Sequence, residues 1–162
     1  MSREIIQPTS VHSTAGVGYS HVARVGDTLY IAGQIALNPS GHLVGKGDIE
    51  SQAQQVYANL AAILKELGGD LSDIVKMTTF LTDRRHLDGF RHVRNGVFSE
   101  PFPPNTLLFI NGLAHPDYLI EVEAVAVISS SRAGPEDNGA TGSRGSGPGR
   151  RNSRTSGSRT TP

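Results

Sequence analysis

The sequence predicts an α+β domain in which two helices pack on one face of a mixed β-sheet. Six short segments have the apolar alternation or the β-branched composition of strands, and two longer segments repeat apolar residues at spacings of three and four. Their order is β-β-β-α-β-α-β-β, which indicates a layered arrangement of sheet and helices. The chain has 162 residues, a length that suits one such domain.

The first strands are predicted around Ile5 and in a hairpin. Residues 22–25 and 28–36 have strand composition, and Gly26-Asp27 between them is a favourable hairpin turn. The remaining strands are predicted over residues 75–82, 106–110 and 119–128, the first of these being rich in β-branched and aromatic residues.

The helices are predicted over residues 48–67 and 84–98. The first has a continuous apolar stripe, begins at Asp48 as N-cap and ends at Gly68-Gly69. The stripe consists of Ile49, Ala53, Val56, Leu60, Ile63, Leu64 and Leu67. The second helix is weaker, because Gly89 and Gly96 lower its propensity. Its inward residues are Leu87, Phe90, Val93 and Val97, and Pro101 lies beyond its end.

The last predicted strand has two different faces, because successive side chains of a strand point to opposite sides. One face is wholly apolar and consists of Ile120, Val122, Ala124, Ala126 and Ile128. The other places Glu121 and Glu123 among aliphatic neighbours. A carboxylate at the edge of an apolar surface is a candidate for a raised pKa and for proton transfer. The alternative is a half-solvated strand whose acids face water.

Charge and composition divide the chain into a domain at residues 1–129 and a tail at residues 130–162. Six arginines against Glu136 and Asp137 give the tail a charge of +4, so the rest of this neutral chain carries −4. The tail is mostly Gly, Ser, Thr, Arg and Pro, and we expect it to be disordered. It is either an inert solubilising segment or a loose contact for RNA, while the acidic domain argues against nucleic acid as its principal partner.

A cytoplasmic homo-oligomer is the expected form of the protein. The N-terminus has no hydrophobic signal segment, and no apolar run approaches the ~20 residues that span a bilayer, so no membrane is expected as a partner. Helices cover one sheet face only, and the other face mixes apolar side chains with acids. A domain of this size should bury such a face against copies of itself.

Several kinds of catalytic site are absent from the sequence. It has no cysteine, no nucleophile elbow, no phosphate-binding glycine loop and no dinucleotide fingerprint. The six histidines have no metal-ligand spacing, so we expect single surface histidines and no metal or cofactor. Carboxylates, one or two tyrosines and backbone amides in glycine-rich turns are the remaining candidates.

The sequence resembles the RidA (YjgF-type) family from about Gly18 to Ile128. The resemblance is carried, in order, by Gly18-Tyr19-Ser20 and by residues 29–39, 73–81, 101–104 and 120–127. It implies a chorismate-mutase-like fold and a homotrimer whose sheets form a central barrel, with ligand clefts between subunits. The implied activity is cofactor-free hydrolysis of enamine and imine intermediates to 2-keto acids and ammonia.

The resemblance also implies site residues. A glutamate of the last strand, which positions water and relays protons, corresponds to Glu123, and we expect Glu121 to be structural. The family tyrosine matches Tyr19, and the glycine whose backbone amide faces the ligand matches Gly33. Asn105 occupies the position of the arginine that binds the substrate carboxylate in the deaminating subgroup.

Two departures from the family pattern bear on the substrate. Asparagine offers hydrogen bonds without charge, and losing a charge-assisted bidentate contact costs on the order of 1.5–3 kcal/mol, so we expect weak binding of standard 2-imino acids at Asn105. Ala32 replaces a serine of many relatives and removes another polar contact. The hypotheses are therefore a hydrolase or deaminase for another small imine, enamine or carbonyl compound, a non-catalytic trimeric metabolite-binding protein, or an RNA-associated protein or ribonuclease.

Overall fold

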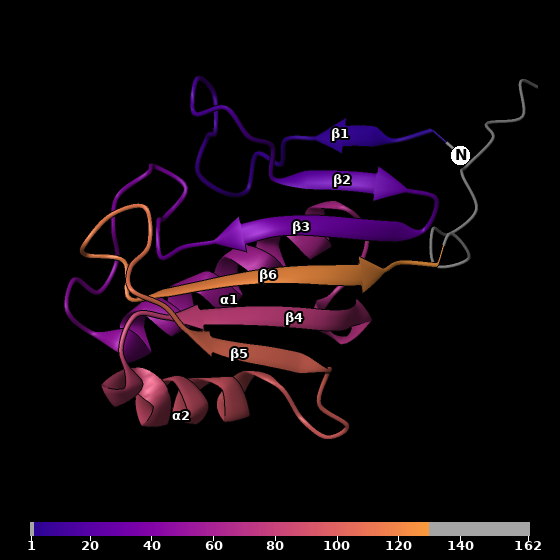
Figure 1. Ribbon diagram of the computed structural model, residues 1–162. Coiled ribbons are helices and arrows are strands. Elements are labelled where there is room, and N and C mark those ends of the chain that lie inside the picture. Colours follow the sequence, from indigo (N-terminus) through magenta and orange to yellow (C-terminus); the bar gives the residue numbers. More distant parts are fainter. Residues whose placement is uncertain (1, 130–162) are drawn as a thin grey trace, which may run out of the picture.

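The computed structural model describes residues 2–129, and the predicted tail at residues 130–162 lies outside the described residues. One mixed sheet has the strand order β1-β2-β3-β6-β4-β5, and both helices cover the same face of it (Figure 1). The strands are β1 Glu4–Ile6, β2 Val22–Val25, β3 Thr28–Gln34, β4 Ile74–Leu81, β5 Asn105–Phe109 and β6 Ile120–Val127. The predicted α+β class and the order of elements are confirmed.

The helices are α1, Ile49–Glu66, and α2, Leu87–Val97. Asp48 caps α1 as predicted, because its side chain accepts a hydrogen bond from the backbone N–H of Glu50. The second helix begins later than predicted, because residues 84–86 form a separate 3₁₀ turn, η2, Arg84–His86, capped by Asp83. A further 3₁₀ turn, η1, Leu71–Asp73, precedes β4.

Strand pairing follows from the connections. The turn at Gly26 has a φ of 60°, a left-handed conformation that favours glycine, and it joins β2 to β3 as an antiparallel hairpin. β6 pairs antiparallel with both β3 and β4, which places it at the centre of the sheet. β4 and β5 are parallel because α2 connects them.

The hydrophobic core lies between the sheet and the helices. On β6 it includes Ile120, Val122, Ala124 and Ala126, the apolar face predicted from alternation. Phe90 and Val93 of α2 are buried as predicted, while Leu87 and Val97 are partly buried. The opposite, open face carries Glu121 and Glu123. No helix in the described part of the chain is both long and apolar enough to cross a membrane.

A β-bulge interrupts β3 where it pairs with β6. Ile31 pairs with Ala124 and Gln34 pairs with Val122, so three steps along β3 match two along β6. The extra residue redirects the side chains on either side of the bulge, because the side-chain period of a strand is two. Ile31 and Gln34 are therefore both buried, and Ala32-Gly33 occupies the bulge between them.

Candidate functional site

Glu121 lies against the backbone of the β3 bulge. A Cβ atom at Gly33 would fall 1.8 Å from Glu121 Oε1 and 2.6 Å from its carboxyl carbon, so only a glycine leaves room for this side chain. Close approach of a carboxylate to the strand thus requires glycine at position 33, while the predicted contact of the Gly33 amide with a ligand stays a prediction. Glu121 is held on a rigid element, since it pairs with Phe80 of β4 on its other side.

The surroundings of Glu121 favour its protonated form. The carboxyl is partly buried, and burial raises its pKa above the ordinary value of 4.5, with a second contribution from the negative charge of Glu123. A carboxyl with a raised pKa is a better base near neutral pH than an ordinary one, and it exchanges protons readily with a bound molecule. Glu121 is therefore a candidate for proton transfer beside the predicted Glu123.

Tyr19 lies close enough to Glu121 for their charges to interact. Burial raises the pKa of the Tyr19 phenol, and electrostatic interactions with Glu121 and then with Tyr118 raise it further. The hydroxyl is therefore un-ionised at neutral pH and available as a hydrogen-bond donor. Tyr19 is 40% exposed and lies in the loop between β1 and β2, so a ligand can reach it.

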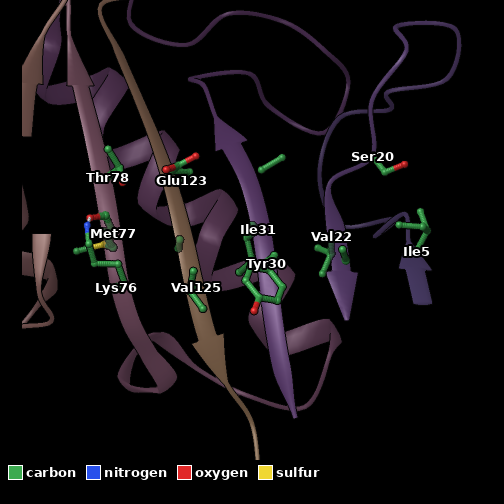
Figure 2. A pocket seen from close by; sticks show the side chains of 13 residues that line it. Ile5, Ser20, Val22, Tyr30, Ile31, Lys76, Met77, Thr78, Glu123 and Val125 are labelled. Atoms are coloured by element: carbon green, nitrogen blue, oxygen red, sulfur yellow. Dashed lines mark hydrogen bonds between the residues drawn. The ribbon is translucent and has the colours of Figure 1, made fainter. Parts of the chain in front are cut away.

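Glu123 lines a cavity on the open face, with a volume of about 370 Å³. Figure 2 shows its carboxylate on β6, with Thr78 of β4 on one side and the side chains of β3 on the other. Tyr30, Val125 and Ile5 supply much of the apolar wall, and Ser20 and Lys76 supply polar groups. Lys76 Nζ donates to Thr106 Oγ1 at 3.0 Å, which directs it toward β5. Glu123 itself is exposed.

Asn105 lies apart from these residues in the single chain. It opens β5 opposite Met77, and its Oδ1 accepts a hydrogen bond from Thr79 Oγ1 at 3.1 Å. Met77 and Thr79 are buried against the helices, and paired residues of neighbouring strands point to the same side. Asn105 therefore belongs to the helix-covered side, whereas Glu121 and Glu123 belong to the open side. Its predicted role at a ligand stays a prediction.

Two of the six histidines are buried, which corrects the expectation of single surface histidines. His12 is 5% exposed and His21 is 1% exposed. Burial is tolerated because His21 Nε2 contacts the backbone oxygen of His12 at 2.8 Å and His21 Nδ1 contacts the Gln34 amide at 3.2 Å. His12 Nε2 lies 3.3 Å from the Tyr19 hydroxyl.

The structure thus brings together two of the four predicted site residues, Tyr19 and Gly33, and adds Glu121. The signal for Glu121 was present in the sequence, because it shares the open face of β6 with Glu123. The contact of Glu121 with Gly33 depends on the bulge in β3, which alternation alone does not reveal, and the predicted role of Glu123 stays a prediction. No cluster of three or more metal-ligating side chains occurs among residues 2–129.

Comparison with known proteins identifies the family. The model of the family described as Endoribonuclease L-PSP matches residues 10–128. A RutC family protein of Pyrococcus abyssi is 35% identical over 126 residues, 78% of this chain and 98% of that protein. The 2-iminobutanoate/2-iminopropanoate deaminase of Dermatophagoides farinae is 30% identical over 110 residues, 68% of this chain and 85% of that enzyme.

The fold agrees with the same family. The crystal structure of RidA from an Antarctic Psychrobacter species has 31% sequence identity and a TM-score of 0.71, covering 77% of this chain and 99% of that one. This chain therefore belongs to the Endoribonuclease L-PSP family, which includes proteins named RidA and RutC. The resemblance predicted from the sequence is confirmed.

Proposed function

We propose that the protein is a cofactor-free hydrolase that deaminates a small imine or enamine, with Glu121 as the group that moves protons. Its working form is a cytoplasmic homotrimer with the ligand cleft between subunits. The observation that carries the proposal is the partly buried Glu121 carboxyl, which has a raised pKa and lies against Gly33 next to the Tyr19 phenol. A relative named as an imine deaminase, 30% identical to this chain, supports the reaction class.

The chemistry requires one base that later acts as an acid. Glu121 takes a proton from a water molecule as the water oxygen bonds to the imine carbon, and the C=N electron pair moves to the nitrogen. Glu121 returns this proton to the nitrogen, which gives an amino alcohol. Glu121 then carries the proton of the new hydroxyl group to the same nitrogen, so that the C–N bond breaks, ammonia leaves and the C–O bond becomes a carbonyl. An enamine first accepts a proton at carbon and loses one from nitrogen, which converts it to the imine. Tyr19 donates a hydrogen bond to the substrate and holds it over Glu121.

The substrate differs from the standard 2-imino acids. Among residues 2–129, the groups whose electrostatic effects shift the pKa values of Glu121 and Tyr19 are Glu121, Glu123 and Tyr118, none of them a cation, and Asn105 supplies no charge of its own. Arg–carboxylate pairs are the strongest recognition of a substrate carboxylate, so a neutral or weakly anionic imine suits this site better.

The test compares Glu121→Gln with Glu123→Gln. Both changes keep size and hydrogen-bonding capacity and remove one carboxylate from the same face of β6, so each is the control for the other. Imines with and without a carboxylate are generated in situ by an amino-acid oxidase or an amine oxidase, and ammonia release is measured above the spontaneous rate. Glu121→Gln should lower turnover by roughly 10²-fold or more, the usual contribution of general acid–base catalysis, while Glu123→Gln should retain most of it.

Opposite results for the two variants would show that Glu123 moves the protons, which is the role predicted for it from the family resemblance. The non-catalytic alternative, a metabolite-binding trimer, is favoured by the open-face cavity around Glu123, which is lined largely by apolar side chains. That alternative requires ligand binding by calorimetry with no turnover of any imine. Cleavage of RNA by residues 1–129 would instead support the ribonuclease hypothesis.

A further inference from the structure

A chain of buried polar contacts leads from Tyr19 to the β3 bulge. The Tyr19 hydroxyl lies 3.3 Å from His12 Nε2, and the His12 ring meets the His21 ring edge-on at a centroid distance of 4.8 Å. His21 contacts Gln34, whose amide nitrogen also donates to the backbone oxygen of Ala32 at 2.9 Å. The two parts of the candidate site, the Tyr19 loop and the Ala32-Gly33 bulge, are therefore joined through the interior.

The partners of His21 determine which of its nitrogens carries the proton. Its Nε2 faces a carbonyl oxygen, that of His12, at 2.8 Å, and a carbonyl only accepts, so Nε2 must be the donor. Its Nδ1 faces the amide nitrogen of Gln34, which only donates, so Nδ1 must be the acceptor. His21 is thus held in one neutral tautomer, and Gln34 is held in one amide orientation.

Only one of the two ring nitrogens of His12 has a hydrogen-bond partner among the described residues. Its Nδ1 is buried without a hydrogen-bond partner among the described residues, and its Nε2 faces the Tyr19 hydroxyl. A buried N–H without an acceptor is costlier than a buried lone pair without a donor, so the proton belongs on Nε2. Burial, and then the nearby His21, lower the pKa of His12, which keeps its ring neutral near pH 7.

We propose that His12 is a positioning residue for Tyr19: its Nε2–H donates to the Tyr19 hydroxyl oxygen and thereby directs the Tyr19 O–H out of the protein toward the substrate. A hydroxyl oxygen that already accepts a hydrogen bond inside the protein presents its own hydrogen to the outside. The site therefore selects a ligand with an oxygen or nitrogen acceptor at this point. The inference rests on the proposed function for the identity of the ligand, while the His12–Tyr19 contact stands on its own.

Gln7 holds the backbone of the loop that carries Tyr19. Gln7 Nε2 donates to the Tyr19 backbone oxygen at 3.4 Å, and Gln7 Oε1 accepts from the His21 backbone N–H at 3.2 Å. The Tyr19 ring also packs edge-on against the His21 ring at a centroid distance of 5.8 Å, and His12 is the side chain that contacts the Tyr19 hydroxyl. Without His12, the hydroxyl would rotate and would donate in any direction, which weakens substrate binding and orientation.

The first arm of the test needs no substrate. Proton-coupled ¹⁵N spectra of the imidazole rings distinguish the two neutral tautomers, and His12→Gln identifies the signals of His12. At pH 7.5 we expect His12 and His21 to carry their protons on Nε2, and we expect Tyr19→Phe to shift the His12 Nε2 resonance. A His12 proton on Nδ1 would make the Tyr19 hydroxyl the donor to the protein and would overturn the proposal.

The second arm uses turnover and two matched variants. The side-chain amide of His12→Gln reaches about as far as Nε2, whereas the amide of His12→Asn reaches only as far as Nδ1. We expect His12→Asn to lower kcat/KM by about tenfold, the usual effect of one lost hydrogen bond, and His12→Gln to remain within about threefold of the parent. In a Tyr19→Phe background, His12→Asn should have no further effect.

The outcomes separate the two proposals. Equal losses for His12→Asn and His12→Gln, or the same loss with Phe at position 19, would show that His12 only fills space. Absence of any turnover in the parent protein would contradict the proposed function. The position of the proton on the His12 ring, measured by ¹⁵N NMR, would then test the His12–Tyr19 hydrogen bond by itself.

Discussion

Gly33 is the residue on which the position of Glu121 most directly depends. Its backbone is not in the left-handed region, so alanine can adopt the same conformation, and the three atoms nearest to a new Cβ all belong to the flexible Glu121 side chain. Gly33→Ala should therefore fold normally and push the Glu121 carboxyl toward solvent. A displacement of about 1 Å can cost on the order of 10²-fold in rate, and we expect a loss of this size in kcat/KM.

The measurement pairs turnover with the pKa of Glu121, followed by ¹³C NMR of its carboxyl. In Gly33→Ala the pKa should fall toward 4.5, because the carboxyl gains water. Gly96→Ala is the control, since a Cβ there meets nothing within 4 Å and the residue lies outside the site. An unchanged pKa together with full activity would show that the contact between Gly33 and Glu121 has no functional role.

The raised pKa of Glu121 also predicts a pH-dependent stability. Burial, and then the charge of Glu123, raise the pKa above 4.5 in the fold, so the folded protein holds this proton more tightly than the unfolded chain. The stability that this carboxyl contributes is complete below pH 4.5 and is lost as the pH rises through its folded pKa. Above that pKa the buried charge destabilises the protein.

Glu121→Gln should therefore raise the thermal midpoint at pH 8 by about 1–3 °C, and the gain should shrink as the pH falls toward 4. Thermal unfolding followed by circular dichroism at several pH values measures this. A variant that is less stable than the parent at pH 8, or a difference that does not change with pH, would contradict the assignment. The expected gain in stability together with a loss of turnover is typical of residues selected for function.

For single residues, the sequence predicts the face of a strand on which a side chain lies better than it predicts the contacts of that side chain. Alternation along β6 placed Glu121 and Glu123 on one open face, and that prediction holds. The contact of the Glu121 side chain with Gly33 was not predictable, because a bulge leaves no signal in the sequence of the partner strand. The burial of His12 was unpredictable for a related reason, because it lies in an irregular loop without periodicity.

Among the elements, α2 offers the clearest test of packing. Gly96 is exposed near the end of this helix, and a Cβ there would meet nothing within 4 Å. Gly96→Ala should stabilise the protein by about 0.5–1 kcal/mol, because glycine loses more backbone entropy than alanine when a helix forms. Urea unfolding measures the difference.

Gly89→Ala is the matched substitution in the same helix with the opposite expectation. Its Cβ would lie 2.8 Å from Ile49 Cγ2 and 3.2 Å from Glu50 Cγ, where α2 contacts the first turn of α1. Overpacking of this kind typically costs about 1–3 kcal/mol, which exceeds the gain in helix propensity. Equal stabilisation by both alanines would show that the contact between the helices is loose. The apolar spacing predicted both helices, but it did not predict that Gly89, and not Gly96, lies at the contact between them.

At the scale of the whole molecule, the open face of the sheet exposes large apolar side chains in the single chain. Ile5, Ala23, Tyr30 and Val125 follow one another across four strands as paired neighbours, and Leu108 pairs with Phe80 beside Glu121. Ile5, Tyr30, Leu108 and Val127 are each 42–53% exposed. Alternation along the strands predicted such a face.

We predict that copies of the chain cover this face and that the protein runs as a trimer. Light scattering coupled to gel filtration should give three times the chain mass of 17.2 kDa at micromolar concentration. Leu108→Glu should shift the protein to monomer, because burying an unpaired carboxylate in an apolar interface costs far more than leaving it in water. Ala58→Glu, on the exposed side of α1, should leave the trimer intact. A monomeric parent protein would remove the reason for a cleft between subunits, and Asn105, which lies apart from Glu121 in one chain, would then have no route to the ligand.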